Sequence, residues 1–342
     1  MYTDFFGLKT LPFNLTPDPE YFYVSSQHGE ALAALTYAIR ERKGFVVLTG
    51  DAGTGKTTLL STVISRLPAG QIQSSILLNP ILTPAEFLEF VMLDFGIGSV
   101  PTSKAQRLWK LQEFLLQTYR ENRIAILVID EAHKLGVDLL EEVRLLGNFE
   151  YGAHKFLQIV LLGQCELDDL LDRQDMRQLK QRVALRVFID PLPAAEVGKY
   201  ICFRWTKAGG LGIPFTPEAV ARVTEFSRGI PRVVNTLCDT ALLAVYGEGR
   251  RSVAAHDISE AGANLGLTGG LAVTHRLQGV PAPSLTGKEI SSGPLPLNAP
   301  TLSPGVPEQY DVPRFAGYGT PRRNSKLFQF LSRKHISPKN SF

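Results

Sequence analysis

Short runs of consecutive apolar residues alternate along the first half of this chain with segments whose apolar residues recur every three or four positions. Continuous apolar runs at 45–49, 124–129 and 157–162 are typical of strands that are buried on both faces of a parallel sheet. Further strands are expected near 75–79 and at 187–189. Because predicted helices separate these strands, the pattern indicates an α/β fold with a doubly wound parallel sheet.

The helices of this α/β region have recognisable beginnings. Ser26 is the expected N-cap of a helix over 27–42, and Glu30 supports its first turn. Thr83 and Pro84 open another helix, since proline fits the first turn. The remaining expected elements are helices at 57–67, 84–94, 104–120 and 138–150, and a loop at 96–103.

The strand pattern stops after residue 191. Helical spacing at 194–208, 217–227, 231–246 and 256–264 predicts a small all-helical domain. From Gly266 onward the chain is rich in Gly, Pro, Ser and Thr and has no periodicity, which is typical of disordered chain.

These boundaries divide the chain into four parts. Residues 1–24 form an aromatic and proline-rich strap that is expected to be extended, because Pro17 and Pro19 oppose helix formation. The basic-aromatic segment 326–334 is either a short partner-docking helix or solvated tail. The other three parts are the α/β domain at 25–191, the helical domain at 192–265 and a basic tail at 266–342.

Charge is distributed unevenly along the 342 residues. The net charge is +3, but nine Lys or Arg and only three Asp or Glu lie from Gly266 onward. The preceding residues therefore carry a net charge of −3. A mildly acidic body argues against a broad nucleic-acid-binding surface on it.

Three cysteines, Cys165, Cys202 and Cys238, show no metal-binding or redox spacing, so they are expected to be buried thiols in a reducing compartment. The N-terminus lacks the basic and long apolar regions of a secretory signal. No apolar run approaches the roughly 18 residues needed to span a bilayer. We therefore expect a cytoplasmic protein, either free or peripheral at the inner membrane through a partner.

The segment from Gly50 to Thr57 (Gly-Asp-Ala-Gly-Thr-Gly-Lys-Thr) directly follows the first apolar run and matches a phosphate-binding loop. Its glycines let backbone N–H groups surround phosphate oxygens, Lys56 can reach the β- and γ-phosphates, and Thr57 can ligate Mg²⁺. The alternative is a glycine-rich turn that matches by chance, but the expected strand before it and helix after it favour the loop. The residues expected to bind ATP are Gly50, Asp51, Ala52, Gly53, Thr54, Gly55, Lys56, Thr57 and Thr58.

Two acidic residues end the second apolar run. Asp130 and Glu131 follow 124–129, at the edge of the sheet where open α/β folds bind their ligands. Asp130 is expected to hold the water shell of the metal, and Glu131 to act as general base toward the attacking water. The alternative is an acidic strand end that caps the next helix. Beside the phosphate-binding loop, the pair predicts hydrolysis rather than binding alone.

Other polar residues extend this candidate site. Gln164, after the fourth strand, either positions the lytic water or caps the next turn. Arg182, and after it Arg177, lie in an arginine-rich segment that is either a solvated helix face or the source of an arginine finger for a neighbouring subunit. Arg232 follows Pro231 at a helix start and either contacts the γ-phosphate or stays in water.

The aromatic residues of the strap at 1–24 are too numerous to be left exposed, so they are expected to pack on the nucleotide domain. Two interpretations of the strap stay open. It forms a wall of the adenine pocket, or it closes one face of the sheet.

The motifs described above together resemble an AAA+ ATPase. The opening of the chain resembles, more narrowly, ATPases of the general secretion pathway protein A kind and related ATPases encoded with exosortase and exopolysaccharide export systems. The segments that carry the resemblance are the loop at 50–57, Asp130-Glu131, Gln164, the arginines before the fifth strand, Gly229-Ile230-Pro231-Arg232, Phe5-Phe6-Gly7-Leu8, Pro12-Phe13 and Thr16-Pro17-Asp18-Pro19.

The resemblance covers about residues 1–265. It implies a nucleotide domain with a helical lid, an active site at a subunit interface, and a ring or filament of identical subunits that works with a secretion or export complex. By the same match, Lys56 and Thr57 are the Walker A pair and Asp130 and Glu131 the Walker B pair. Gln164 takes the sensor 1 position, where Asn, Ser or Thr is commoner, and Arg232 takes sensor 2.

Two functions of different classes follow from this reading. The first is an oligomeric AAA+ ATPase that uses Mg²⁺ and ATP at subunit interfaces to assemble or energise a secretion or polysaccharide-export system. The second is a DNA-loaded regulator of the transposition target-selection or origin-recognition type, which ranks lower because the body is acidic and no helix-turn-helix pattern follows the lid. Secretion ATPases of this kind often continue into a membrane span and a periplasmic peptidoglycan-binding domain. The sequence after Gly266 shows neither, which favours the shorter cytoplasmic relatives.

Overall fold

The structure, a computed structural model, describes residues 2–68, 70–151 and 154–267 of the chain. The tail expected at 266–342 lies outside the described residues except for its first two positions, and so does the segment at 326–334. Within the described part of the chain, no helix is both long and apolar enough to cross a membrane.

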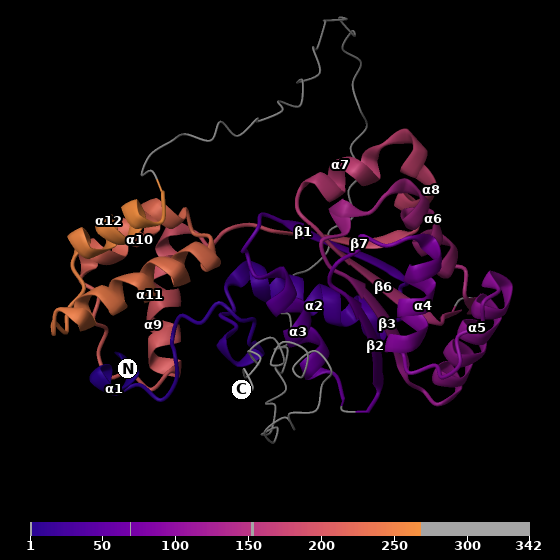
Figure 1. Ribbon diagram of the computed structural model, residues 1–342, viewed down its shortest axis with the longest axis horizontal. Helices are drawn as coiled ribbons and strands as arrows, with labels where there is room; N and C mark the ends of the chain where they lie inside the picture. The colour runs from indigo at the N-terminus through magenta and orange to yellow at the C-terminus, as the bar shows by residue number, and fades with distance from the viewer. Residues whose placement is uncertain (1, 69, 152–153, 268–342) are drawn as a thin grey trace, which may run out of the picture. The chain divides into compact units, whose positions relative to one another are not determined.

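In the described residues, five parallel strands form one sheet (Figure 1). The order across the sheet is β2-β3-β6-β1-β7. Strands β1 and β6 lie side by side, with Val46 next to Val160 and Leu48 next to Leu162. The strands are β1 (Phe45–Gly50), β2 (Ile72–Leu77), β3 (Ile124–Ile129), β6 (Leu157–Leu162) and β7 (Val183–Ile189). The predicted parallel sheet is therefore confirmed, and all carboxyl ends of its strands lie along one edge.

The side chains of the central strands point alternately into two apolar cores. In β1, Phe45 and Val47 join one core, whereas Val46 and Leu48 join the other. The first core lies under α4 (Pro84–Asp94), α5 (Lys104–Arg120), α6 (Val137–Leu146), α7 (Glu166–Asp172) and α8 (Arg177–Lys180). The second lies under α2 (Ser26–Arg40) and α3 (Lys56–Arg66) (Figure 1).

The two edge strands depart from their expected positions. Strand β2 begins at Ile72 rather than near Ser75, and β7 begins at Val183 rather than Val187. Each has a neighbour on one side only, so polar side chains such as Arg186 interrupt its apolar pattern.

Three local differences concern helices and a hairpin. Helix α2 is capped by Ser25 rather than Ser26, because the Ser25 hydroxyl accepts a hydrogen bond from the backbone N–H of His28. Helix α6, expected at 138–150, ends before Gly147, which packs so closely on Phe45 that an added Cβ would lie 2.2 Å from the ring. Among the elements that sequence analysis missed are helix α7, a hairpin of β4 (Glu150–Tyr151) and β5 (His154–Lys155), and short 3-10 turns at Ala132–Lys134 and Gln174–Met176.

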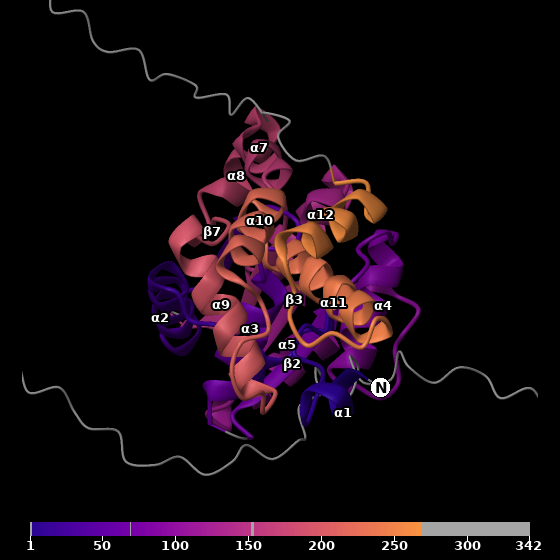
Figure 2. The ribbon, with the colours of Figure 1, turned by 90° about the vertical axis from the view of Figure 1, so that its left-hand side faces the viewer.

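In residues 192–267, four helices enclose a separate apolar core (Figure 2). They are α9 (Ala194–Lys207), α10 (Pro217–Ser227), α11 (Pro231–Gly247) and α12 (Ala255–Asn264). Each lies within one or two residues of its predicted position. Pro217 and Pro231 stand in the first turn of their helices, where no backbone donor is needed.

The N-terminal strap differs from the prediction in conformation and in packing. It begins with a short helix, α1 (Tyr2–Phe6), and a 3-10 turn at Pro19–Tyr21 follows. The side chains of Tyr2, Leu8 and Phe13 are buried in the core of α9 to α12 rather than on the nucleotide domain, whereas Phe22 packs on the core under α2 and α3 as expected. The Phe6 ring contacts the Trp205 ring edge-on, which explains why an aromatic segment forms a helix here.

Candidate functional site

The loop between β1 and α3 has a backbone that requires glycine. Gly50, Gly53 and Gly55 have φ angles of 148°, 86° and 97°, which side chains strongly disfavour. A Cβ on Gly50 would also lie 2.3 Å from the carbonyl oxygen of Ile189. The strand therefore passes into α3 through a tight concave turn, and the first N–H groups of α3 are directed to the same region.

Lys56 is the first residue of α3, and its ammonium group is held over the loop. Its Nζ donates to the carbonyl oxygens of Gly50 at 2.7 Å and Asp51 at 2.8 Å. Burial lowers the pKa of Lys56, while the charges of Asp130, Glu131 and Asp51 act in the opposite direction. A buried cation whose donors rest on loop carbonyls can transfer those hydrogen bonds to a phosphate.

Thr57 and Asp130 meet across the end of the sheet. The Thr57 hydroxyl donates to Oδ2 of Asp130 at 2.9 Å, and the backbone N–H of Glu131 donates to Oδ1 at 2.8 Å. Burial raises the pKa of Asp130, and these two hydrogen bonds lower it. A hydroxyl beside a carboxylate fits Mg²⁺, which binds oxygen ligands and keeps several waters. The described residues contain no cluster of three or more His, Cys, Asp or Glu suited to a metal, so these two side chains would share Mg²⁺ with phosphate and water.

Glu131 stands next to this pair in a strained conformation. Its φ is 54°, a left-handed value that is rare for residues other than glycine and often marks functional sites. Its Oε2 lies 3.2 Å from Nζ of Lys134 and 3.5 Å from Nε2 of His133. With its side chain 39% exposed, the carboxylate is accessible to water.

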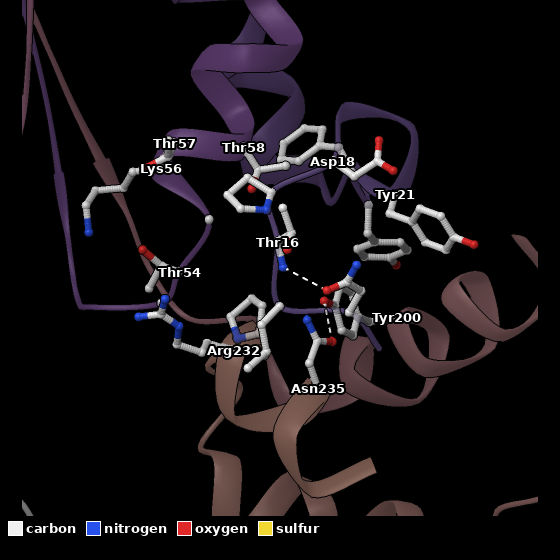
Figure 3. A pocket seen from close by; sticks show the side chains of 18 of the residues that line it. Thr16, Asp18, Tyr21, Thr54, Lys56, Thr57, Thr58, Tyr200, Arg232 and Asn235 are labelled. Carbon is white, nitrogen blue, oxygen red and sulfur yellow. Dashed lines mark hydrogen bonds between the residues drawn. The ribbon is translucent and has the colours of Figure 1, made fainter. Parts of the chain in front are cut away.

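A cavity of about 290 Å³ connects the loop to the helical lid formed by α9–α12. Its walls come from residues 52–58, Asp130 and Glu131, from strap residues 14–18 and 21–23, and from the lid. In Figure 3, Lys56, Thr54 and Arg232 lie at one end of this cavity, and Tyr200 and Asn235 at the other. The cavity thus has a phosphate end, and a second end lined by aromatic and amide side chains.

The lid touches the loop through main-chain atoms. The N–H of Arg232, in the first turn of α11, donates to the carbonyl oxygen of Gly53 at 3.2 Å. A Cβ on Gly53 would lie 2.7 Å from the Cβ of Arg232, so the contact needs a glycine on the loop side. The Arg232 side chain is exposed, lines the cavity, and has no ion pair with a described residue. It is free to bind an anion.

Comparison with known proteins agrees with this geometry. Residues 39–171 match the family model described as "AAA domain". General secretion pathway protein A of Aeromonas hydrophila is 39% identical over 260 residues, which are 76% of this chain and 47% of that protein. The chain therefore spans about half the length of this relative.

Solved structures share the fold. Cdc6p from Pyrobaculum aerophilum has a TM-score of 0.59 at 16% identity, over 76% of this chain and 72% of that chain. The Aeropyrum pernix ORC1 protein, solved in complex with DNA, has a TM-score of 0.56 at 17% identity, over 72% and 67% of the two chains. The chain belongs to the AAA+ family. Its resemblance to the general secretion pathway protein A type is confirmed, whereas the likeness to exosortase-associated relatives stays a prediction.

The remaining predicted residues of this AAA+ chain lie outside the cavity. Gln164 follows β6, which is the neighbour of β3, and its backbone N–H donates to Nδ1 of His133 at 3.3 Å. Arg177 and Arg182 do not line the cavity, and neither has an ion pair with a described residue. By contrast, Arg186 pairs with Asp168 and Asp172 of α7. Arg177 is exposed and available to a neighbouring molecule, whereas Arg182 is half-buried and its charge helps to lower the pKa of the Glu141 carboxyl.

The prediction of three buried cysteines holds fully only for Cys238 and is wrong for Cys165. Cys165 is exposed, because it precedes α7 at the open edge of the sheet, and its thiol lies 3.6 Å from Oδ1 of Asp51. Partial burial and the nearby Asp51 carboxylate raise its pKa. Cys202 is half-buried, and Cys238 is buried as expected.

Sequence analysis missed several cavity residues outside the loop. His28 is buried beside the loop, hydrogen-bonded to Ser25 at 2.7 Å and to the backbone of Thr54. Burial lowers the pKa of its imidazole. Tyr200, Arg204 and Asn235 line the far end of the cavity. One signal in the sequence could have pointed to them. Arg204 is a charged residue one helical turn after Tyr200, on the side of α9 whose other residues are apolar and buried.

Proposed function

We propose that this AAA+ protein is an Mg²⁺-dependent ATPase. The observation that supports the proposal is the contact between Thr57 and Asp130, with Glu131 beside it at the phosphate end of the cavity. A loop for phosphate binding needs only Lys56 and the backbone. The neighbouring carboxylates add what hydrolysis requires, which is a metal ligand and a base near water.

Each residue has a role in this proposal. Lys56 holds the β- and γ-phosphates, and Thr57 with Asp130 holds the metal, directly or through its waters. When bound, Mg²⁺ neutralises charge on the phosphate oxygens. Glu131 accepts a proton from the attacking water, and Arg232 stabilises charge on the γ-phosphate from the lid side.

We infer that Gln164 orients the attacking water, from the strand end next to Asp130. Its strand, β6, lies between β1 and β3, so the residue stands between the loop and the acidic pair. Its backbone already binds His133, which also lies close to Glu131. In this proposal the amide side chain of Gln164 binds the water that Glu131 deprotonates.

We further propose that the protein works as a ring or filament of identical subunits, and that Arg182 or Arg177 reaches the γ-phosphate of a neighbouring subunit. Their lack of ion pairs in the described chain supports this role, because a finger must be free to bind phosphate. The similarity to General secretion pathway protein A supports a task in assembling or energising a secretion or polysaccharide-export complex. Such a protein would work in the cytoplasm, docked on the inner-membrane complex through a protein partner.

A DNA-loaded regulator is the second candidate function. The Aeropyrum pernix ORC1 protein has the same fold and was solved with DNA, which supports keeping this candidate. It predicts that duplex DNA accelerates ATP hydrolysis and that added salt removes the acceleration steeply. An ATPase rate that is unchanged by DNA at low salt would rule it out.

Replacing Glu131 with glutamine tests the proposed hydrolysis. The amide keeps the shape of the side chain and removes the base, so ATP affinity should stay within about twofold and turnover should fall by roughly 10²–10⁴-fold. Glu113→Gln on the exposed face of α5 is the matched control. Undiminished turnover in Glu131→Gln would remove Glu131 from the mechanism.

A mixing experiment tests the shared active site. Arg182→Ala and Arg177→Ala should each be compared with Arg173→Ala, whose guanidinium is already paired with Asp175. The finger variant should lose up to about 10³-fold in rate, and mixing it with Glu131→Gln should restore part of the activity, because some mixed interfaces contain both intact groups. A specific rate independent of protein concentration, with no recovery on mixing, would contradict shared sites.

A further inference from the structure

Arg204 of α9 is a buried cation at the far end of the cavity, with its side chain almost fully enclosed. Its three nitrogens all donate hydrogen bonds. Nε donates to the carbonyl oxygen of Pro12 at 2.5 Å, Nη2 to that of Asn14 at 3.1 Å, and Nη1 to the Tyr200 hydroxyl at 3.1 Å. Arg204 therefore binds the strap backbone on both sides of Phe13, where the cavity-lining segment 14–18 begins.

No carboxylate balances this charge among the described residues. Arg204 is only 7% exposed, and the other neighbours of its guanidinium are the rings of Tyr21 at 5.0 Å and Tyr200 at 5.7 Å. Burying a charge without an acidic partner is costly, and an apolar side chain would stabilise the lid core at less cost. The residue is thus better explained by what it does for the cavity than by lid stability.

The hydrogen bonds of Arg204 continue toward the cavity. The Tyr200 hydroxyl accepts from Arg204 and donates to Oδ1 of Asn235 at 2.8 Å (Figure 3). This direction occupies the amide oxygen of Asn235. Its NH₂ group has no hydrogen bond to a described residue and faces the cavity, so it can donate to a ligand.

We propose that Arg204 is the positioning residue of the nucleobase subsite. It fixes strap residues 14–23 as one wall and orients the Asn235 amide as a donor to a ring nitrogen of the base. The proposal rests on the proposed function, because it assigns the second end of the same cavity. Asn235 and Arg232 stand three positions apart on α11, so one helix carries groups for both ends of the nucleotide.

The test compares a ligand with a base and one without. Binding of Mg-ADP and of magnesium pyrophosphate to the full chain is measured by calorimetry for wild type, Arg204→Met and Tyr200→Phe. Arg204→Met should weaken ADP binding about tenfold or more and leave pyrophosphate binding within about twofold, since only the base wall is lost. Tyr200→Phe removes a single oxygen and should weaken ADP binding by a few-fold with the same selectivity.

Arg222→Met is the matched control, because Arg222 also stacks on a lid ring, that of Phe226, but does not line the cavity. Thermal unfolding checks that each variant folds. If Arg204→Met does not fold, the comparison of ADP and pyrophosphate binding is made with Tyr200→Phe. Unchanged ADP binding, or equal losses for ADP and pyrophosphate, would overturn the proposal. A wild type that binds neither ligand would instead show that the proposed function has failed.

Discussion

Replacing Lys56 with methionine isolates the contribution of its ammonium group to nucleotide binding. In the ligand-free protein that group donates two hydrogen bonds, to the carbonyl oxygens of Gly50 and Asp51. Methionine keeps the length and apolar volume of the stem and removes the charge. Because burial already disfavours the charged form, as the lowered pKa shows, the loss of those bonds is partly offset by the removal of a buried charge.

The expected changes in nucleotide affinity and in the free energy of unfolding differ in size. A hydrogen bond to a charged group contributes about 1.5–3 kcal/mol, so losing the bond to phosphate should weaken Mg-ATP binding roughly tenfold to a hundredfold. The free energy of unfolding should change by less than about 2 kcal/mol, since the two effects on the ligand-free protein oppose each other.

Isothermal titration with Mg-ATP and urea unfolding measure the two quantities. Lys199→Met is the control, because Lys199 is an exposed lysine of α9 that does not line the cavity. Wild-type affinity in Lys56→Met would refute the assignment of this loop to phosphate. An affinity loss accompanied by unfolding would show that the structural reasoning about the loop carbonyls is wrong.

Two more predictions concern stability. Burial lowers the pKa of His28 below its ordinary 6.5, so the unfolded chain takes up a proton first as the pH falls, and the free energy of unfolding should decrease below about pH 6.5. His28→Gln should show a smaller decrease between pH 7.5 and 5.5 in urea titrations, and an identical slope would contradict the argument. At Gly229, with φ of 78°, an added Cβ would lie 1.9 Å from the carbonyl oxygen of Leu192, so Gly229→Ala should lower the melting temperature by several degrees and weaken ATP binding. Gly247→Ala, with open space around its Cβ, should do neither.

The central strands could be predicted from sequence because both of their faces are buried. β1, β3 and β6 are continuous apolar runs, and the structure has them at or within one residue of their expected ends. The edge strands β2 and β7 were misplaced by three and four residues at their starts. Their exposed sides admit polar residues, so the apolar run that signals a strand is shorter than the strand itself.

The phosphate end of the cavity follows from local sequence, whereas at the other end only the strap was foreseen, as one of two interpretations. Residues 50–57 form one contiguous motif. Asp130 directly follows a buried strand, and the carboxyl ends of parallel strands lie along the same edge of the sheet, so its place near the loop could be predicted. Tyr200, Arg204 and Asn235 at that end, and His28 beside the loop, come from helices far apart in the chain and line one cavity only through the tertiary fold. Helix α1 was missed for the same reason, because its aromatic side chains are stabilised by the lid core rather than by local helix propensity.

The bond between the Gly53 carbonyl and the Arg232 amide has a consequence for how this protein can vary. Every amino acid except proline supplies that amide, so no ordinary replacement of the arginine deletes the link. Such a substitution would remove the guanidinium and keep the backbone hydrogen bond between lid and loop. The effect of the side-chain charge can therefore be measured separately from the effect of the lid–loop contact.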